Sequence, residues 1–397
     1  KPRNLVDMAF EVAAVRPGVG ANDGVSEFIR RRTAGTVHYE HELEVPALQR
    51  TLRVALFQDQ FNELAIHVAG FTSTEAEEFR RAHGRADEQE AILHYWWPRF
   101  RDGAAARGAN ERTAACIFSK FNGHYMFPES HAYAFGVTAY QMSWLKHYHP
   151  LEFYVGLFNE QPMGFYSLET LKEDAKHHSI RILNPDINHS RARSVIHDNA
   201  LLLGLLNVGS VGATVAEAIV AERDAHGPYR SIADLMARSG IRQDSLDNLT
   251  DAGALDSLAR AAVHERQSPV AQERSSRRQT RWEVGLRYRP VSRQLAMELP
   301  VEQDMISLPP ATDWEIMESE YRTMGLHPQS HLMAYLRDRL PNVTTSADIW
   351  SKPDGAEVLV AGLVVRRQRP QAKAYFLTLE DEFGHTPTLA WPDTYKR

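Results

Sequence analysis

The chain has 397 residues with a formal net charge of −6, and its 43% hydrophobic and 24% charged residues are ordinary for globular proteins. This composition excludes a largely disordered chain, and the charge excludes a protein whose whole surface binds polyanions, although local basic patches stay open. No hydrophobic run approaches the ~20 residues that cross a bilayer, and the first residues do not resemble a signal peptide, so we expect a cytoplasmic protein without membrane contact. The length predicts about two or three domains.

The first part of the chain is predicted to be helical. Residues 54–69 repeat hydrophobic side chains at helical spacing, which is typical of a helix with one buried face. Thr72 or Ser73 is expected to cap the next helix, because a hydroxyl there accepts hydrogen bonds from free backbone amides. Another helix is predicted over 132–146, and Pro150 is expected to open a further one.

Short hydrophobic runs in the middle and at the end of the chain predict strands. Residues 200–204 read Ala-Leu-Leu-Leu-Gly, and later runs lie at 357–367, 374–381 and 388–391. Three strands in such a short final stretch do not close a barrel. The last runs therefore predict only part of a β-domain.

One segment is strongly basic. Between Arg266 and Arg293 the chain has eight arginines against two glutamates, with Ser and Gln interleaved. This pattern favours a basic connector or an exposed helix over a core element. A solvated face and a surface that contacts phosphate are both open interpretations of it.

The most informative local signal is a glycine hairpin. Residues 208–212 read Val-Gly-Ser-Val-Gly before a helical run, and Gly209 and Gly212 let the backbone approach another chain closely. Amides of such a hairpin and of the following helix grip a DNA phosphate without reading sequence. A second, degenerate copy is expected over 245–258, with Gly253 in the hairpin position. A dinucleotide loop, which would need a further glycine, and a plain helix-capping turn are the alternatives.

Other local signals carry less information. The glycine-rich stretch 18–24 predicts a turn, or a loop that holds phosphate. Arg80 and Arg81 end a predicted helix, where they either cap carbonyl groups or hold a triphosphate. The single cysteine, Cys116, cannot form an internal disulfide and is expected in a core. Paired histidines lack the companion ligands of a metal site and are expected on the surface; the pairs are His38 with His41, His147 with His149, and His177 with His178.

Several segments together resemble a known family. Five blocks in order are similar to the bacterial C-family replicative polymerases, the DNA polymerase III alpha subunits; they are residues 12–18, 56–60, 69–81, 127–135 and 140–146. Within that family, three further segments are similar to the error-prone, damage-tolerant branch of the ImuC type. These are residues 159–166, 277–283 and 321–326.

The resemblance implies a mainly α, multidomain fold with a tandem helix-hairpin-helix and a C-terminal, partial OB-fold β-domain. By position, residues 1–15 match the end of the palm, 16–190 the fingers, 191–262 the tandem helix-hairpin-helix, 263–350 a basic connector and 351–397 the partial OB fold. The family's PHP domain, thumb and most of its palm have no counterpart in these 397 residues.

The resemblance also implies a metal site. Polymerases of this family hold two Mg²⁺ ions with palm aspartates, and Asp7 matches the third of these by its position before the Arg-Pro-Gly block. Asp7 is therefore the candidate catalytic and metal-binding residue. An ordinary acidic residue at a helix N-terminus is the alternative interpretation. A single carboxylate cannot hold both ions, so this chain alone is expected to bind DNA without extending a primer.

For the nucleotide site, Arg80 and Arg81 match the arginine pair of the family's fingers, and Lys120, Ser130 and His131 fall in the block beside the nucleotide pocket. Two segments depart from the family pattern. Residues 82–86 keep the glycine but only one of two cations, and residues 16–19 read Arg-Pro-Gly-Val where the family has Arg-Pro-Gly-Pro. DNA contact is expected at Gly209, Gly212 and Gly253.

The leading hypothesis is thus an error-prone DNA polymerase that acts on primer-template DNA and deoxynucleoside triphosphates. Residues 294–299 have the Gln-x-x-aliphatic spacing of a sliding-clamp peptide, so a clamp and mutasome accessory proteins are further candidate partners. The alternative hypothesis is a non-catalytic, DNA-binding scaffold built from the hairpins and the OB strands. A palm with paired aspartates in the natural protein would favour the polymerase hypothesis over the scaffold hypothesis.

Overall fold

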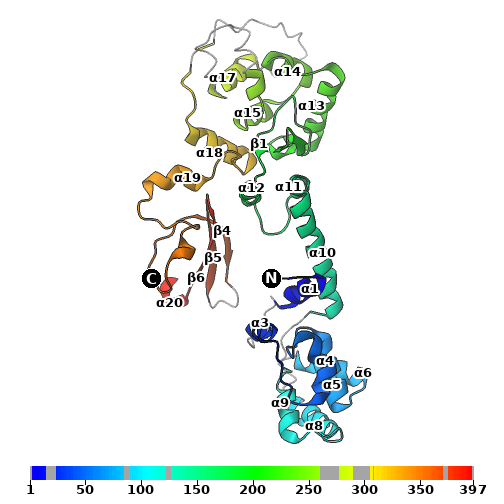
Figure 1. Cartoon of the computed structure of the whole chain (residues 1–397). Coiled ribbons are helices and arrows are strands. Elements are labelled where there is room, and N and C mark those ends of the chain that lie inside the picture. Colours follow the sequence, from blue (N-terminus) through cyan, green and yellow to red (C-terminus); the bar gives the residue numbers. More distant parts are fainter. Residues whose placement is uncertain are drawn as a thin grey trace. The chain divides into compact units, whose positions relative to one another are not determined.

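The structure is a computed structural model (Figure 1) that describes residues 2–14, 24–84, 90, 92–121, 127–259, 277–288, 305–306, 308–369 and 374–395. Contacts divide the chain into two compact units, Lys1–Trp144 and Leu145–Arg397. Most described residues are helical and two small sheets complete the structure, which confirms the mainly α fold class. In these ranges every helix is too short or too polar to span a lipid bilayer.

In its described residues the first unit consists of helices and loops, and its last helix, α10, continues into the second unit. In chain order they are α1 (Leu5–Ala14), α3 (Gly24–Ala34), η1 (Glu42–Glu44), α4 (Val45–Leu48), η2 (Gln49–Thr51), α5 (Gln58–Ala69), α6 (Ser73–His83), the π-helix η4 (Ile92–Trp96), α8 (Trp97–Ala105), α9 (Glu111–Phe118) and α10 (Glu129–Tyr148). Helix α5 packs against α4, α6 and α8, and it buries the face predicted from its spacing. The expected cap of α6 is confirmed, because the Thr72 hydroxyl accepts from the Glu75 amide at 3.2 Å.

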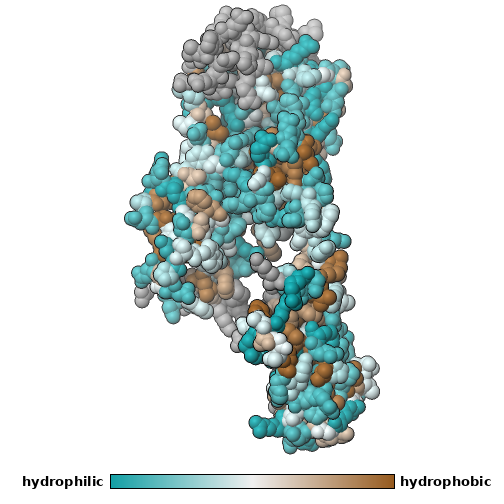
Figure 2. All heavy atoms as spheres, viewed as in Figure 1, coloured by the Kyte–Doolittle hydropathy of each residue, from teal (hydrophilic) through white to brown (hydrophobic). Residues whose placement is uncertain are grey.

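Helix α10 is longer than predicted and is mostly exposed. It buries only Ala132 and Gly136. A Cβ atom on Gly136 would lie 3.0 Å from the backbone nitrogen of Ala9, so glycine is what lets α1 pack closely on this helix. Hydrophobic residues elsewhere on α10 remain at the surface (Figure 2); they include Phe135, Val137, Met142 and Leu145.

The second unit combines helices with two three-stranded sheets. Its elements are α11 (Pro150–Asn159), α12 (Leu168–His177), β1 (Ile182–Leu183), β2 (Val195–His197), β3 (Ala200–Leu202), η5 (Leu205–Asn207), α13 (Ala213–His226), α14 (Ile232–Ser239), α15 (Gln243–Asp251), α17 (Arg277–Arg287), α18 (Asp313–Met324), α19 (Leu332–Leu336), η7 (Arg337–Arg339), η8 (Ile349–Ser351), β4 (Leu363–Gln368), β5 (Tyr375–Asp381), β6 (Gly384–Ala390) and α20 (Pro392–Tyr395). In the first sheet β3 lies between β1 and β2, and in the second sheet β4, β5 and β6 are antiparallel neighbours. The predicted strands are thus confirmed, although β4 begins six residues later than 357.

Of the basic segment 266–293 the structure describes residues 277–288, which form α17 and one residue beyond it. Helix α17 packs against α15, and Val284 belongs to the same hydrophobic core as the residues of α13 to α15. Its first arginine, Arg277, is only 14% exposed, and it lies 2.8 Å from the Glu320 carboxylate and 3.2 Å from Asp256. The prediction of an exposed helix was therefore only partly right: α17 buries one face, at Thr280 and Val284, and acidic residues distant in sequence pair with its arginines.

A buried ionic cluster joins α12 to the end of α18. The Lys172 side chain is fully buried, and its Nζ lies 2.8 Å from a Glu169 oxygen and contacts the Glu173 carboxylate. The same Nζ donates to the Ser330 carbonyl oxygen at 2.8 Å. Burial raises the pKa of Tyr321, whose hydroxyl donates to Glu169. Two carboxylates and one ammonium are therefore held away from water in this cluster.

Candidate nucleic-acid interface

The predicted hairpin lies between η5 and α13. Val208 and Val211 are buried and fix the loop to the core, while Gly209, Ser210 and Gly212 are exposed. The Val211 amide closes the turn by donating to the Val208 carbonyl oxygen at 3.1 Å. The alternation of buried valine and exposed small residues therefore places the tip of the hairpin at the surface.

The amides of this hairpin differ in what they can bind. The Gly209 amide donates to the Thr323 carbonyl oxygen at 2.7 Å, so DNA contact at this exposed glycine stays a prediction that the amide itself does not support. Gly212 is the N-cap of α13 with an extended backbone and no side chain to cap the helix. A Cβ atom on Gly212 would meet no atom within 4 Å. The amides in the first turn of α13, which have no acceptor within the helix, thus stand at an open surface suited to an anion.

A second hairpin lies beside the first, but at other residues than predicted. It is formed by Gly240, in the left-handed conformation at φ +59°, and by buried Ile241, between α14 and α15. The Asn248 side-chain amide donates to the Gly209 carbonyl oxygen at 2.9 Å, and this bridge holds α15 against the first hairpin. Two turns thus lie side by side, but the second is at Gly240 and not in the predicted segment 245–258.

Gly253, the predicted tip of the second hairpin, is buried. It follows the end of α15 with φ +82°, a conformation that favours glycine. A Cβ atom there would lie 2.3 Å from the Arg277 guanidinium, which covers the turn. Gly253 thus shapes an internal helix end and is not a hairpin glycine, so this position gives no support to the prediction that it contacts DNA.

The two arginines at the end of α6 share one acidic partner. Arg80 Nη2 and Arg81 Nε each lie 2.7 Å from Glu77 Oε1. Hydrogen bonding, from Arg80 above all, lowers the pKa of the Glu77 carboxyl to about 2. Among the described residues neither arginine bonds a helix carbonyl, so the capping interpretation has no support. One carboxylate for two guanidinium groups leaves a local positive charge.

The start of α10 lies near these arginines. Arg80 Nη1 is 3.5 Å from the side-chain oxygen of Gln58. The backbone amide of Gln58 donates to the Phe127 carbonyl oxygen at 3.0 Å. Ser130 is exposed in the first turn of α10, and the His131 ring lies 4.3 Å from that of Phe127. Gln58, which had not been singled out from the sequence, thus connects Arg80 with the block that contains Ser130 and His131.

Lys120 is engaged in a different contact. Its ammonium group forms an ion pair with the fully buried carboxylate of Glu44. Burial lowers the pKa of Lys120, and the nearby negative charge of Glu44 partly offsets this effect. A nucleotide role for Lys120 stays a prediction, because releasing it would leave Glu44 buried with less compensation.

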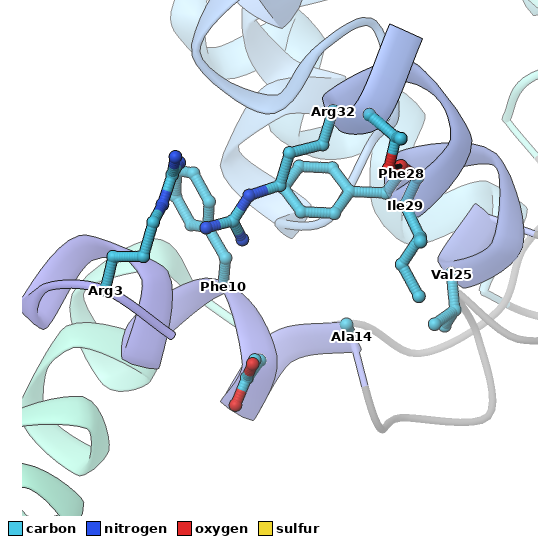
Figure 3. A pocket seen from close by; sticks show the side chains of 9 residues that line it. Arg3, Phe10, Ala14, Val25, Phe28, Ile29 and Arg32 are labelled. Carbon is cyan, nitrogen blue, oxygen red and sulfur yellow. Dashed lines mark hydrogen bonds between the residues drawn. The ribbon is translucent and has the colours of Figure 1, made fainter. Parts of the chain in front are cut away.

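Asp7 sits at the first turn of α1 and is bound by arginines. Its Oδ2 atom accepts from the Arg3 amide at 2.8 Å and from Arg32 Nη2 at 2.5 Å, while its own amide donates to Asn4. Burial raises the pKa of Asp7, but the contacts with Arg3 and Arg32 outweigh this effect and lower it. Residues of α1 and α3 line a cavity of about 410 Å³. Figure 3 shows the Arg3 and Arg32 side chains beside the Phe10 ring in this lining.

The metal role of Asp7 has no support in this geometry. In the described ranges, no group of three or more His, Cys, Asp and Glu side chains could hold a metal ion. The carboxylate instead accepts from the Arg3 amide just before α1 and pairs with two guanidinium groups, while the Asn4 side chain caps the helix. A two-metal site therefore does not fit the described residues by themselves.

Two family models match the chain. "Bacterial DNA polymerase III alpha subunit finger domain" matches residues 1–108, and "Helix-hairpin-helix motif" matches residues 179–267, which include both hairpins. The chain contains a DNA polymerase III alpha finger domain. The match of the finger domain starts at residue 1, so it includes Asp7 as well as Arg80 and Arg81.

Longer bacterial proteins are similar to the whole chain. Proteins named "Error-prone DNA polymerase" from Nocardia farcinica, Mycolicibacterium paratuberculosis and Corynebacterium diphtheriae are 36%, 35% and 34% identical to it over 97%, 100% and 100% of this chain. The chain spans 34% to 37% of the length of these relatives. The finger domain and the hairpins are thus parts that this chain shares with much longer proteins.

Within the finger domain, replacing Asp7 by Asn is expected to lower the free energy of unfolding at pH 7 by about 1–2 kcal/mol. The contacts that lower the pKa of Asp7 stabilise the fold above the unfolded pKa, and this contribution is lost as the pH falls through the folded pKa. The unfolding temperatures of the wild type and of Asp7→Asn should therefore differ at pH 7 and become equal in acid. A full-length variant with unchanged stability and turnover reduced by orders of magnitude would assign Asp7 to the metal site instead.

Proposed function

We propose that this chain is the nucleotide- and duplex-binding part of an error-prone DNA polymerase that extends a primer with deoxynucleoside triphosphates. The observation that carries this proposal is the pair of adjoining hairpins, of which the first ends in the open, uncapped N-terminus of α13. The similarity to proteins named error-prone DNA polymerase supports it. Because the chain spans about a third of those proteins, the catalytic activity is proposed for the longer protein.

The hairpins are proposed to hold duplex DNA by its backbone. The first-turn amides of α13 offer hydrogen bonds and the positive end of a helix dipole to a phosphate oxygen. Arg242, exposed at the N-cap of α15, places a cation at the second hairpin. Contacts of this kind position a protein on DNA but do not select a sequence, which suits an enzyme that must act at any site.

Arg80 and Arg81 are proposed to contact the triphosphate of the incoming nucleotide. Their guanidinium groups match phosphate oxygens in geometry and charge, and they share a single carboxylate that a triphosphate could replace. Ser130, exposed in the first turn of α10, is proposed to add a hydroxyl donor, and His131 an aromatic surface. Together these side chains would orient the nucleotide for attack by the primer.

A divalent metal requirement is proposed on family grounds alone. Polymerases of this kind use divalent ions, and Mg²⁺ is the proposed ion, to assist the attack of the primer hydroxyl. The described residues of this chain do not supply the ligand set, so no step is assigned to them. The proposed clamp peptide, residues 294–299, lies outside the described residues, and contacts with a sliding clamp, with mutasome accessory proteins and a cytoplasmic location also remain proposals.

A non-catalytic DNA-binding scaffold is the second candidate, because the paired hairpins alone account for DNA binding by this chain. A primer-extension assay separates the two candidate functions. The full-length protein should extend a primer with Mg²⁺ and four nucleotides, whereas the 397-residue chain should bind duplex DNA without extending it. A full-length protein that binds DNA but extends no primer would favour the scaffold.

In the full-length protein, replacing Arg80 and Arg81 by Ala is expected to raise the KM for nucleotide by about ten- to a hundredfold. The affinity for primer-template should change little, because the charge is lost at the nucleotide and not at the duplex. Arg101→Ala is the matched control, since Arg101 is an exposed arginine paired with Asp102 in the same finger domain. A normal nucleotide KM with weakened DNA binding would place the pair on the duplex.

A further inference from the structure

A cavity in the second unit lies between the first sheet and α18. Its volume is about 610 Å³, which is in the range of small-molecule sites. The end of β1, the turn between β2 and β3, the turn after α15 and one face of α18 all contribute to its lining. The fold thus brings together segments that are distant in sequence to form this cavity.

The lining of this cavity is strongly acidic. Of the side chains that the structure places there, the one guanidinium group of Arg277 stands against five carboxylates, those of Asp186, Asp198, Asp256, Asp313 and Glu320. Arg277 is already paired, at 2.8 Å from Glu320 and at 3.2 Å from Asp256. Two histidines of the lining lie beside aspartates: His189 is 2.9 Å from Asp186, and His197 is 3.5 Å from Asp198. The cavity therefore repels an anion such as a DNA phosphate and attracts a cation.

Two of the carboxylates stand at the surface on different walls. Asp198 is 82% exposed at the turn between β2 and β3. Asp313 is exposed at the start of α18, and it forms no ion pair with another described residue. The Glu320 carboxylate, in contrast, is buried and engaged, because it accepts from Asn184 Nδ2 at 2.6 Å and lies 2.5 Å from His327 Nδ1. The two exposed aspartates are thus the carboxylates that a ligand can reach.

These carboxylates do not converge on one point. Across the described part of the chain, His, Cys, Asp and Glu side chains are nowhere grouped in threes so that they could hold a metal ion. Separate carboxylates fit a cation whose positive charges are also separated. Leu183, Leu202 and Ile316 add hydrophobic side chains to the same lining. The lining therefore suits a long cation with charged ends and a hydrophobic stem.

A buried hydroxyl in this lining lacks a partner. Ser257 lines the cavity after the end of α15, and its Oγ atom is shielded from solvent without a hydrogen bond to any described residue. A buried polar atom without a partner costs free energy, which a ligand that hydrogen-bonds to it recovers. A serine hydroxyl can accept from an amine N–H group. Ser257 is thus a second sign of a ligand, independent of the carboxylates.

We propose that this cavity binds a linear polyamine of the spermidine class. Ammonium groups would pair with Asp198 and Asp313, and the methylene groups between them would contact the hydrophobic side chains of the lining. An amine N–H would donate to Ser257 Oγ. A lysine side chain of a protein partner carries one ammonium group, whereas the exposed carboxylates stand on two walls, so the arrangement favours the polyamine. This site is separate from the hairpins and does not rest on the proposed polymerase function.

The test is isothermal titration calorimetry of the 397-residue chain with spermidine in the absence of DNA. The wild type should bind spermidine with a single-site isotherm. Asp198→Asn and Asp313→Asn are each expected to weaken the affinity about fivefold, the upper value for an exposed ion pair. Ser257→Ala should weaken it about tenfold, because a buried hydrogen bond to a charged group is lost.

The matched control is Glu318→Gln. Glu318 is an exposed acidic residue of α18 outside the cavity lining, so the loss of the same charge there should leave the affinity for spermidine unchanged. Mg²⁺ at equal ionic strength should not displace spermidine. Equal weakening in Glu318→Gln, or displacement by Mg²⁺, would mean attraction to the overall charge and would overturn the site. A wild type that binds no spermidine would also overturn it, and a tetralysine peptide that binds in its place would identify a protein partner as the ligand.

Discussion

Replacing Gly212 by Asp is expected to weaken duplex binding by about ten- to a hundredfold, while the protein stays at least as stable as the wild type. Aspartate is a better N-cap than glycine, and the space around Gly212 is open, so the helix α13 should gain a few tenths of a kcal/mol. The same carboxylate occupies the first-turn amides and repels a phosphate. Duplex affinity at fixed salt and the unfolding temperature should therefore move in opposite directions.

Two controls separate the causes of this effect. Gly212→Asn caps the amides without adding charge, so it should weaken binding less than Gly212→Asp does. Gly156→Asp adds the same charge at an exposed glycine of α11 with open space around it, and it should leave duplex affinity nearly unchanged. Wild-type duplex affinity in Gly212→Asp would show that the N-terminus of α13 does not hold the phosphate.

Replacing Lys172 by Met is expected to reduce the free energy of unfolding by about 3–5 kcal/mol. The substitution leaves the Glu169 and Glu173 carboxylates buried without the ammonium group that compensates them, and it removes the bond to the Ser330 carbonyl. Denaturant unfolding of the 397-residue chain measures the change.

The neighbouring lysine provides the control for this change. Lys176 lies 3.6 Å from the same Glu173 carboxylate but is one-third exposed, so Lys176→Met should cost less than about 1 kcal/mol. Glu169→Gln and Glu173→Gln remove the two buried charges. If the triple variant with Lys172→Met regains stability, the loss in Lys172→Met comes from uncompensated charge. A loss below 1 kcal/mol in Lys172→Met would mean that water reaches the cluster.

Features with a local cause could be predicted from the sequence. The cap at Thr72 and the helix that begins at Pro150 depend only on neighbouring residues, and both are confirmed. The hairpin at 208–212 was found because two valines and two glycines at fixed spacing determine its turn. Strand β3 followed from an uninterrupted run of leucines.

Features set by long-range pairing could not be predicted. Gly253 resembles a hairpin glycine until Arg277, 24 residues later, covers it. Helix α17 looks solvated until Asp251, Asp256 and Glu320 are brought to its arginines. Composition alone cannot show which distant acidic residues will be neighbours.

The same limit applies to the residues predicted for the nucleotide site, whose role no observation tests. Arg80 and Arg81 were assigned by their position in the family pattern, and their shared partner Glu77 lies within one helix turn. Lys120 was assigned by the block in which it falls, but its partner Glu44 lies 76 residues earlier. Asp7 likewise contacts Arg32, 25 residues away, which its sequence context does not indicate, and its metal role stays a prediction.

The bond from the Gly209 amide to the Thr323 carbonyl ties the hairpin to the end of α18 before any DNA is present. A free glycine loop would lose conformational entropy on binding, and each residue newly fixed costs about 1–2 kcal/mol. Here Thr323 and Asn248 already fix the loop. Its conformational entropy is therefore lost when the protein folds, and not when it binds a ligand. The proposed binding of successive phosphates at this hairpin would therefore require no reordering of its backbone.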